Sequence, residues 1–284
     1  MILITGATGT NGVEVIRALA AIGESARALV RDPQKAAKLL PEDTQLVRGD
    51  LDDPGSLEAA MEDVERVFLL CPVSPKQPEL EANVVDAAKK AGVRHLVKFS
   101  VLHASPTSPA TLLRWHAQTE QHIRAAGIPF TFLRPNMFMQ EMLRQADAIK
   151  SQAAFYFPFA PDVRLSLVDV RDNAAVAAKV LSERGHEGKI YELTGPVALT
   201  FPQIAEKLSS ALKRQINYVQ VSMDQWKQGF AATGAPGWLI DQVVELYLTF
   251  VPANSVVTDT ISKLLGRPAK SFDDFVKENA NGFG

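Results

Sequence analysis

With 284 residues, of which 46% are apolar, the chain is long enough for one large α/β unit or for a nucleotide-binding domain with a smaller second lobe. The formal net charge of -2 does not indicate the basic surface that binds nucleic acid. Because Cys71 is the only cysteine, an intrachain disulfide and a metal site built from cysteines are excluded. No apolar stretch approaches the ~20 residues of a membrane span, and the first predicted strand leaves no room for a signal peptide, so we expect a cytoplasmic protein that binds neither membrane nor metal.

The chain begins with an apolar strand that leads directly into a turn with regularly spaced glycines. Residues 2–4, Ile-Leu-Ile, form an unbroken apolar run, which is typical of a parallel strand covered by helices on both faces. Gly6, Gly9 and Gly12 follow at three-residue spacing, and the apolar periodicity predicts a helix from Val13 onward.

This order of strand, turn and helix is that of a dinucleotide-binding site. Gly6 allows the tight turn, Gly9 lets backbone N–H groups approach a pyrophosphate, and Gly12 removes a side chain that would hold the helix off the strand. The helix N-terminus adds a partial positive charge. The alternative is an ordinary loop of an α/β protein. The residues expected to bind the cofactor in this turn are Gly6, Ala7, Thr8, Gly9, Thr10, Asn11 and Gly12.

Strands and helices then alternate along the first half of the chain. Further strands are predicted at residues 25–30, 45–48, 67–71, 95–100 and 130–134. Helices are predicted to begin within residues 31–35 and to cover residues 53–61, 79–91 and 112–126. Six strands separated by helices of this length predict an α/β fold with a doubly wound parallel sheet.

The regular alternation of strands and helices ends after Arg134. Helices are predicted at residues 137–150, 169–181 and 201–212, strands at 191–194 and 216–221, an aromatic stretch broken by proline at 153–159, and a mostly helical region at 223–284. We expect a Rossmann domain over residues 1–152, to which residues 163–195 return, and a smaller, mostly helical lid lobe over residues 153–284. A substrate pocket would lie between the two.

The end of the second strand carries the signal for cofactor choice. Arg31 lies where the adenosine ribose of a bound dinucleotide belongs, and a guanidinium pairs with a 2′-phosphate. Lys35, one helical turn later, can add a second charge. The competing interpretation is that Asp32 accepts the ribose hydroxyls while Arg31 points to solvent. We favour NADP(H), because Arg31 is nearer to the strand end.

The ends of the following strands should complete the binding site, because ligands of doubly wound folds lie over the carboxyl ends of the strands. After the third strand, Asp50 and Leu51 would flank the adenine. Cys71, Pro72 and Val73 after the fourth strand would line the path to the nicotinamide. Ser100, at the end of the fifth strand, is also expected to bind the cofactor.

Five stretches of the chain resemble the NmrA-like, atypical short-chain dehydrogenase family: residues 5–12 (TGATGTNG), 29–33 (LVRDP), 49–51 (GDL), 87–92 (AAKKAG) and 132–138 (FLRPNMF). Within that family the chain looks most like the NADPH-dependent quinone and triphenylmethane reductases. The resemblance implies an extended Rossmann fold and NADPH bound at the glycine turn and Arg31. It also implies that Pro135, Asn136 and Phe138 lie beside the nicotinamide. The family includes both reductases and redox-sensing regulators.

The acid of ordinary short-chain dehydrogenases is missing. Those enzymes use Tyr-x-x-x-Lys to protonate the product oxygen, and no tyrosine of this chain has a lysine four residues later. In the helix before the sixth strand, His116 and Glu120 share one helix face. His116 could donate a proton while Glu120 orients it, or the pair could be a hydrogen-bonded surface or a helix-packing contact.

The missing tyrosine acid limits the chemical class of acceptor that the protein could reduce. Hydride transfer to a plain ketone leaves an alkoxide that must be protonated, whereas a quinone or a cationic dye gives a delocalised phenolate or a neutral carbon. We therefore expect an NADPH-dependent oxidoreductase acting on a small conjugated, aromatic acceptor, with a pocket formed by Met137, Phe138, residues 155–159 and the aromatic C-terminal helices.

Two alternatives belong to other functional classes. The first is an NADP(H)-binding redox-sensing regulator without catalysis. The second is a nucleotide-sugar epimerase or dehydratase, against which the missing Tyr-x-x-x-Lys argues. Monomer and homodimer are both open.

Overall fold

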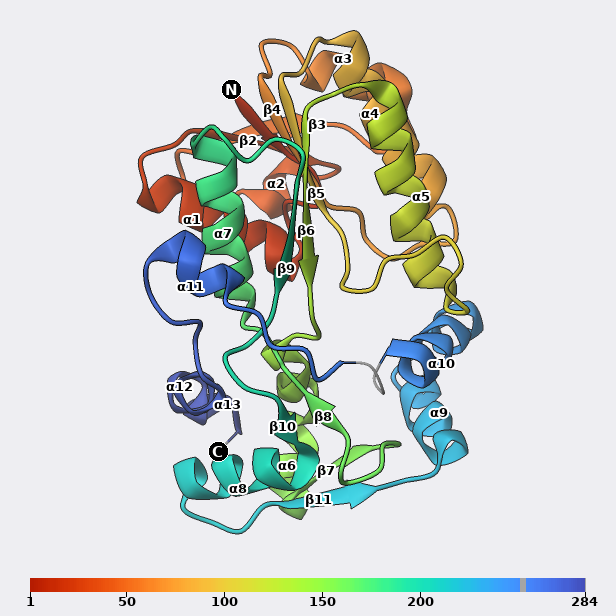
Figure 1. Cartoon of the computed structure of the whole chain (residues 1–284), viewed down its shortest axis with the longest axis vertical. Coiled ribbons are helices and arrows are strands. Elements are labelled where there is room, and N and C mark those ends of the chain that lie inside the picture. The colour runs from red at the N-terminus through yellow and green to blue at the C-terminus, as the bar shows by residue number, and fades with distance from the viewer. Residues whose placement is uncertain (251–253, 284) are drawn as a thin grey trace.

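A seven-stranded sheet forms the centre of the molecule in the computed structural model, which describes residues 1–250 and 254–283 (Figure 1). Its strands are β1 (Ile2–Ile4), β2 (Ala26–Val30), β3 (Gln45–Arg48), β4 (Arg66–Leu69), β5 (His95–Phe99), β6 (Phe130–Pro135) and β9 (Lys189–Leu193). Their order is β3-β2-β1-β4-β5-β6-β9, and every neighbouring pair is parallel. The predicted parallel sheet is therefore confirmed, with β9 as its seventh strand.

Helices cover both faces of this sheet, as expected for unbroken apolar strands. On one face lie α1 (Thr10–Ala21) and α7 (Val170–Ser182), with α11 (Thr260–Leu265) beside α7. On the other face lie α3 (Pro54–Ala60), α4 (Gln77–Lys90) and α5 (Thr111–Ala126), and the short helix α2 (Pro33–Ala36) follows β2. The doubly wound prediction is confirmed.

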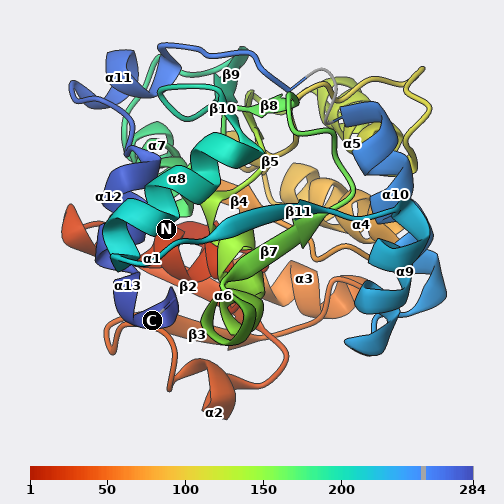
Figure 2. The ribbon, with the colours of Figure 1, turned by 90° about the horizontal axis from the view of Figure 1, so that it is seen from below.

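A second lobe lies beyond the carboxyl ends of the strands (Figure 1). It contains η1 (Met139–Gln145), α6 (Ala146–Gln152), β7 (Ala154–Phe157), β8 (Arg164–Leu165), β10 (Leu199–Thr200), α8 (Phe201–Leu212), β11 (Asn217–Gln220), α9 (Met223–Ala232), α10 (Gly237–Phe250), α12 (Phe272–Glu278) and α13 (Ala280–Phe283). Two small sheets, β8 with β10 and β7 with β11, lie among these helices. Figure 2 shows α12 and α13 to one side of β7 and β11, and α9 and α10 to the other. The mostly helical character is as predicted.

Most boundaries differ from the prediction by one or two residues, and three differences are larger. The helix expected from Val13 begins at Thr10, because a first helical turn tolerates residues of low helix propensity. The helix expected at 137–150 is divided into η1 and α6. The stretch 153–159 contains β7, while β8 and β10 were not predicted, because two-residue strands show no periodicity.

The chain passes between the two parts more than once. Between residues 163 and 195, α7 packs on α1 and β9 joins the large sheet, whereas β8 pairs with β10 of the second lobe. The domain division at residues 152 and 153 stays a prediction, and residues 251–253 and 284 lie outside the described part. Within residues 1–250 and 254–283, no helix is long and apolar enough to cross a membrane.

Candidate functional site

A cavity of about 740 Å³ opens where the strand order of the sheet reverses, between β1 and β4. This is the position at which doubly wound folds bind their ligands. Thr5 joins the two strand ends here: its Oγ1 donates to the carbonyl of Leu70 at 2.8 Å and accepts from the Leu70 N–H at 2.9 Å. The lining residues are Gly6, Ala7, Thr8, Gly9, Thr10, Asn11, Leu29, Val30, Arg31, Gly49, Asp50, Leu51, Leu70, Cys71, Pro72, Ser74, Leu80, Phe138, Gln140, Glu141 and Arg144.

The glycine turn leaves space that side chains would fill. Gly6 has φ +60°, and an added Cβ would lie 2.7 Å from the Leu70 carbonyl oxygen. A Cβ on Gly12 would lie only 2.2 Å from the Gly6 oxygen, whereas one on Gly9 would lie at 3.3 Å. Gly12 therefore serves helix packing, while Gly9 faces the cavity.

The N-terminus of α1 is available to an anion. Gly9 is the N-cap residue, and no side chain caps the helix. In the described part of the chain, the buried Oδ1 of Asn11 has no hydrogen-bond partner. Uncapped N–H groups, a partial positive charge and closely packed glycines fit the pyrophosphate of a dinucleotide.

Arg31 and Asp32 have different surroundings at the end of β2. The exposed Arg31 lines the cavity and makes no ion pair with any described residue. The Asp32 carboxylate caps α2, where it accepts from the Lys35 N–H at 3.1 Å and pairs with Lys35 Nζ at 3.4 Å. The backbone hydrogen bond from Lys35 lowers the pKa of Asp32. Asp32 is thus engaged away from the cavity, which favours Arg31 as the ribose-side contact.

The thiol of Cys71, two residues after β4, is weakly acidic. Cys71 lines the cavity, and its Sγ donates to the Pro72 carbonyl at 3.3 Å. Burial, with a smaller effect from the Glu81 carboxylate, raises the pKa of the thiol to about 12. Cys71 is therefore a neutral, apolar part of the wall at neutral pH.

Two of the residues expected to bind the cofactor, Ser100 and Asn136, form hydrogen bonds within the protein. The Oγ of Ser100 donates to Glu120 at 2.7 Å, and the Nδ2 of Asn136 donates to the Oγ of Ser166 at 2.6 Å. The Oδ1 of Asn136 accepts from the N–H of Met137 and from the side chain of Asn254. The predicted cofactor residues that do not line the cavity are Gly12, Lys35, Val73, Ser100, Pro135 and Asn136, and their contact with the cofactor stays a prediction.

His116 and Glu120 also lie outside the cavity lining. Glu120 is 1% exposed and accepts from Arg134 at 2.9 and 2.6 Å as well as from Ser100, so it ties α5 to β5 and β6. Burial and the nearby Lys98 lower the pKa of His116 well below its ordinary value, and its Nδ1 has no hydrogen-bond partner among the described residues. These contacts agree with the packing alternative, and a proton-donating His116 stays a prediction.

The aromatic stretch expected in the acceptor pocket lies in the core of the second lobe instead. Phe155, Phe157 and Phe159 are at most 6% exposed and pack around Phe201. Their side chains therefore fill the lobe rather than line the cavity. The reason is that β7 pairs with β11 and directs its apolar face toward α8.

The cavity also contains residues that the sequence analysis missed: Leu29, Val30, Gly49, Leu70, Ser74, Leu80, Gln140, Glu141 and Arg144. Three of them lie on η1, directly after the segment that the resemblance placed beside the nicotinamide. The polar residues Gln140, Glu141 and Arg144, so soon after that segment, could have indicated a site. The apolar periodicity instead predicted an ordinary helix, so the side that faces the cavity could not be assigned.

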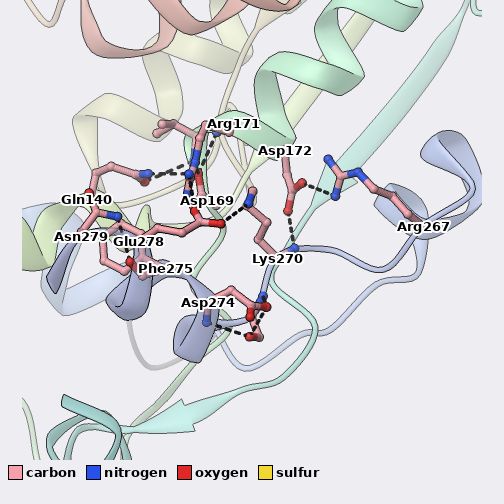
Figure 3. Close-up of polar contacts among 12 residues, drawn as sticks. Gln140, Asp169, Arg171, Asp172, Arg267, Lys270, Asp274, Phe275, Glu278 and Asn279 are labelled. Carbon is pink, nitrogen blue, oxygen red and sulfur yellow. Dashed lines mark hydrogen bonds and ion pairs between the residues drawn. The ribbon is translucent and has the colours of Figure 1, made fainter. Parts of the chain in front are cut away.

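Gln140 connects η1 to a polar network behind the cavity (Figure 3). Its Nε2 donates to Asp169 at 3.1 Å, and its Oε1 accepts from the Val170 N–H at 3.2 Å. Arg171 holds both carboxylate oxygens of Asp169, at 2.9 and 2.5 Å, and also pairs with Glu278 of α12. Burial alone would raise the pKa of Asp169, but the hydrogen bonds from Arg171 and Gln140 lower it. These contacts link α12 to the start of α7 and, through Gln140, to η1.

Known proteins resemble this chain over its whole length. It is 40% identical over 285 residues to the NAD(P)H azoreductase of Xenophilus azovorans, covering 100% of this chain and 99% of that protein. The NADPH complex of an NADPH-dependent quinone oxidoreductase from Escherichia coli is 32% identical, with a TM-score of 0.88 and 99% and 100% coverage. The triphenylmethane reductase of a Citrobacter species is 28% identical, with a TM-score of 0.87 and 99% coverage of both chains.

The sequence pattern over most of the chain defines the family. The NmrA-like family model matches residues 1–264, which include the whole large sheet and most of the second lobe. The predicted resemblance is therefore confirmed: the chain belongs to the NmrA-like family.

Proposed function

We propose that this chain is an NADPH-dependent reductase that transfers a hydride to a conjugated, aromatic acceptor such as a quinone or a dye. The observation that carries the proposal is the cavity at the switch point, which combines an uncapped helix N-terminus with the unpaired Arg31 at the end of β2. The relatives named above support it, since they comprise an azoreductase, a quinone oxidoreductase and a dye reductase.

The proposed cofactor contacts follow the cavity wall from end to end. The backbone of residues 6–11 binds the pyrophosphate, and Arg31 pairs with the 2′-phosphate. Asp50 and Leu51 flank the adenine, while Cys71, Pro72 and Phe138 line the nicotinamide end. When bound, NADPH supplies the hydride; the protein supplies position and an apolar surface.

The proposed compartment is the cytoplasm, and the proposed partner is a small molecule rather than nucleic acid. The only cysteine, Cys71, is free and buried, so the chain needs no oxidising surroundings for a disulfide. A redox-sensing regulator would also lack Tyr-x-x-x-Lys. The experiment must therefore distinguish the reductase from such a regulator.

Oxidation of NADPH by the purified protein in the presence of quinones, azo dyes, triphenylmethane dyes and enones separates the two. A reductase oxidises NADPH only when an acceptor is present. A regulator binds NADPH tightly and oxidises it with none of them. Epimerase activity would require the missing tyrosine and lysine.

A further inference from the structure

Reduction of a quinone or an azo compound needs a proton as well as a hydride. The proton donor must reach the same cavity as the cofactor, and it must be able to lose a proton at neutral pH. The groups of the cavity lining that carry or exchange a proton are Arg31, Asp50, Cys71, Glu141 and Arg144.

Four of these five groups are unsuitable. The two arginines remain charged under all ordinary conditions. Asp50 follows β3, at the adenine end of the cavity, where its Oδ1 accepts from the Asp52 N–H at 3.2 Å. The Cys71 thiol is too weak an acid, as shown by its raised pKa. Glu141 is the remaining group among the described lining residues.

Glu141 follows Phe138 by three residues and lines the cavity with it, at the end assigned above to the nicotinamide in the proposed function. Its side chain is 33% exposed, so water can reach the carboxyl group. Burial raises the pKa of Glu141, while the Arg144 guanidinium, 3.1 Å away, opposes that shift only in part. From α10, Tyr247 faces the same group, and its pKa is raised by burial and by the Glu141 carboxylate.

The backbone before Glu141 is held by residues 168–170. The N–H of Met139 donates to the Val168 carbonyl at 2.9 Å, and the N–H of Val168 donates to the Met137 carbonyl at the same distance. Next to this bridge, Gln140 bonds to Asp169 in the network of Figure 3. The start of η1 is thus held against α7, which keeps the Glu141 side chain at the cavity.

We propose that Glu141 is the proton donor to the acceptor, a role that rests on the proposed reductase function. A quinone that takes a hydride from NADPH is left with a negatively charged oxygen. The O–H bond of the protonated Glu141 carboxyl breaks and a new O–H bond forms on that oxygen; on an azo acceptor the new bond is N–H. The carboxylate regains its proton from water, so one NADPH and one proton are consumed for each acceptor reduced.

Glu141→Gln removes the acidic proton but keeps the shape of the side chain. Turnover of a quinone should fall by about 10²–10⁴-fold, the usual contribution of a positioned general acid, while the dissociation constant for NADPH stays within about twofold. Glu14→Gln is the matched control: Glu14 pairs with Arg17 at 2.8 Å with the same i, i+3 spacing on α1, outside the cavity lining. It should leave turnover unchanged.

Arg144→Gln supplies a second, opposite effect. In the unmutated protein, turnover should decline as the pH rises through the pKa of Glu141, because the acid loses its proton. Removing the guanidinium takes away the effect that lowers this pKa. The decline should therefore move to higher pH in Arg144→Gln and be absent from Glu141→Gln.

Titration of the protein without cofactor gives a readout that is independent of turnover. In protein labelled with ¹³C at the glutamate carboxyl groups, the resonance missing from Glu141→Gln should titrate above the ordinary glutamate range. It should titrate higher still in Arg144→Gln. The titration tests whether Glu141 holds its proton more firmly than an ordinary glutamate, and the turnover of Glu141→Gln tests whether that proton is used.

The inference is overturned if Glu141→Gln reduces quinones at the wild-type rate, if Glu141 of the unmutated protein titrates as an ordinary glutamate, or if Tyr247→Phe loses turnover while Glu141→Gln retains it. Failure of the reductase proposal looks different. In that case the unmutated protein itself oxidises no NADPH with any acceptor.

Discussion

The phosphate turn and η1 border the same cavity but are held in place by different means. The turn depends on backbone geometry: Gly6 at positive φ and Gly12 packed against the Gly6 carbonyl. The start of η1 depends on residues distant in sequence: its backbone bonds to that of Val168, and Gln140 bonds to Asp169, which Arg171 connects to α12. The geometry of the turn is therefore local in sequence, whereas the position of η1 on the cavity wall depends on how the second lobe packs.

The largest expected effect concerns the two glycines of the turn, which the structure separates. Gly12→Val puts a branched side chain where even a Cβ would lie 2.2 Å from the Gly6 oxygen, so the free energy of unfolding should fall by more than about 3 kcal/mol. Gly9→Val should keep the fold but lose NADPH binding, since its Cβ has more room and faces the cavity. Urea unfolding and NADPH titration measure the two effects.

Gly229→Ala is the control for these variants. Gly229 lies inside α9 with nothing within 4 Å of an added Cβ, so alanine there should leave stability unchanged or slightly higher. A Gly12→Val protein as stable as wild type would contradict the packing role.

The second effect concerns Glu120, which the structure ties to Arg134 and Ser100. Glu120→Ala leaves the partly buried Arg134 without its carboxylate, which should cost about 2–4 kcal/mol of stability. NADPH affinity of the folded fraction should change little, because Glu120 does not line the cavity. Chemical denaturation together with NADPH binding checks this; weakened binding without loss of stability would restore Glu120 to the site.

The third effect concerns Arg31 and the preference for NADPH over NADH. Arg31→Ala should weaken NADPH binding by about 1.5–3 kcal/mol, the range for a hydrogen bond to a charged group, and leave NADH binding unchanged. Calorimetry with both cofactors measures the difference. Equal affinities of the unmutated protein for NADPH and NADH would remove Arg31 from its proposed role.

The smallest effect concerns His116. Because it does not line the cavity and its lowered pKa keeps it neutral, His116→Ala should reduce quinone turnover by less than about tenfold. A loss of about 10²-fold or more, with the protein still folded, would instead assign the proton to His116 and would make the comparison of the two cavity ends wrong.

The same contrast explains what could be predicted from the sequence. The large sheet and its helices followed from unbroken apolar runs and from terminal glycines such as Gly92 and Gly127, which have positive φ in the structure. The glycine turn could be predicted because the strand, the glycine spacing and the helix that define it are all local in sequence. The position of Glu141 at the cavity could not be predicted, since a 3-10 segment does not show the ordinary helical period. The partners of Glu120 depend on which strands become neighbours.

The most direct measurement of the central claim is the stoichiometry of NADPH oxidation with a simple quinone. The account predicts that one NADPH is oxidised for each quinone reduced, that one proton is taken up with it, and that oxidation stops without the quinone. Tight binding of NADPH with no oxidation by any quinone, azo dye, triphenylmethane dye or enone would contradict the reductase and favour the redox-sensing regulator.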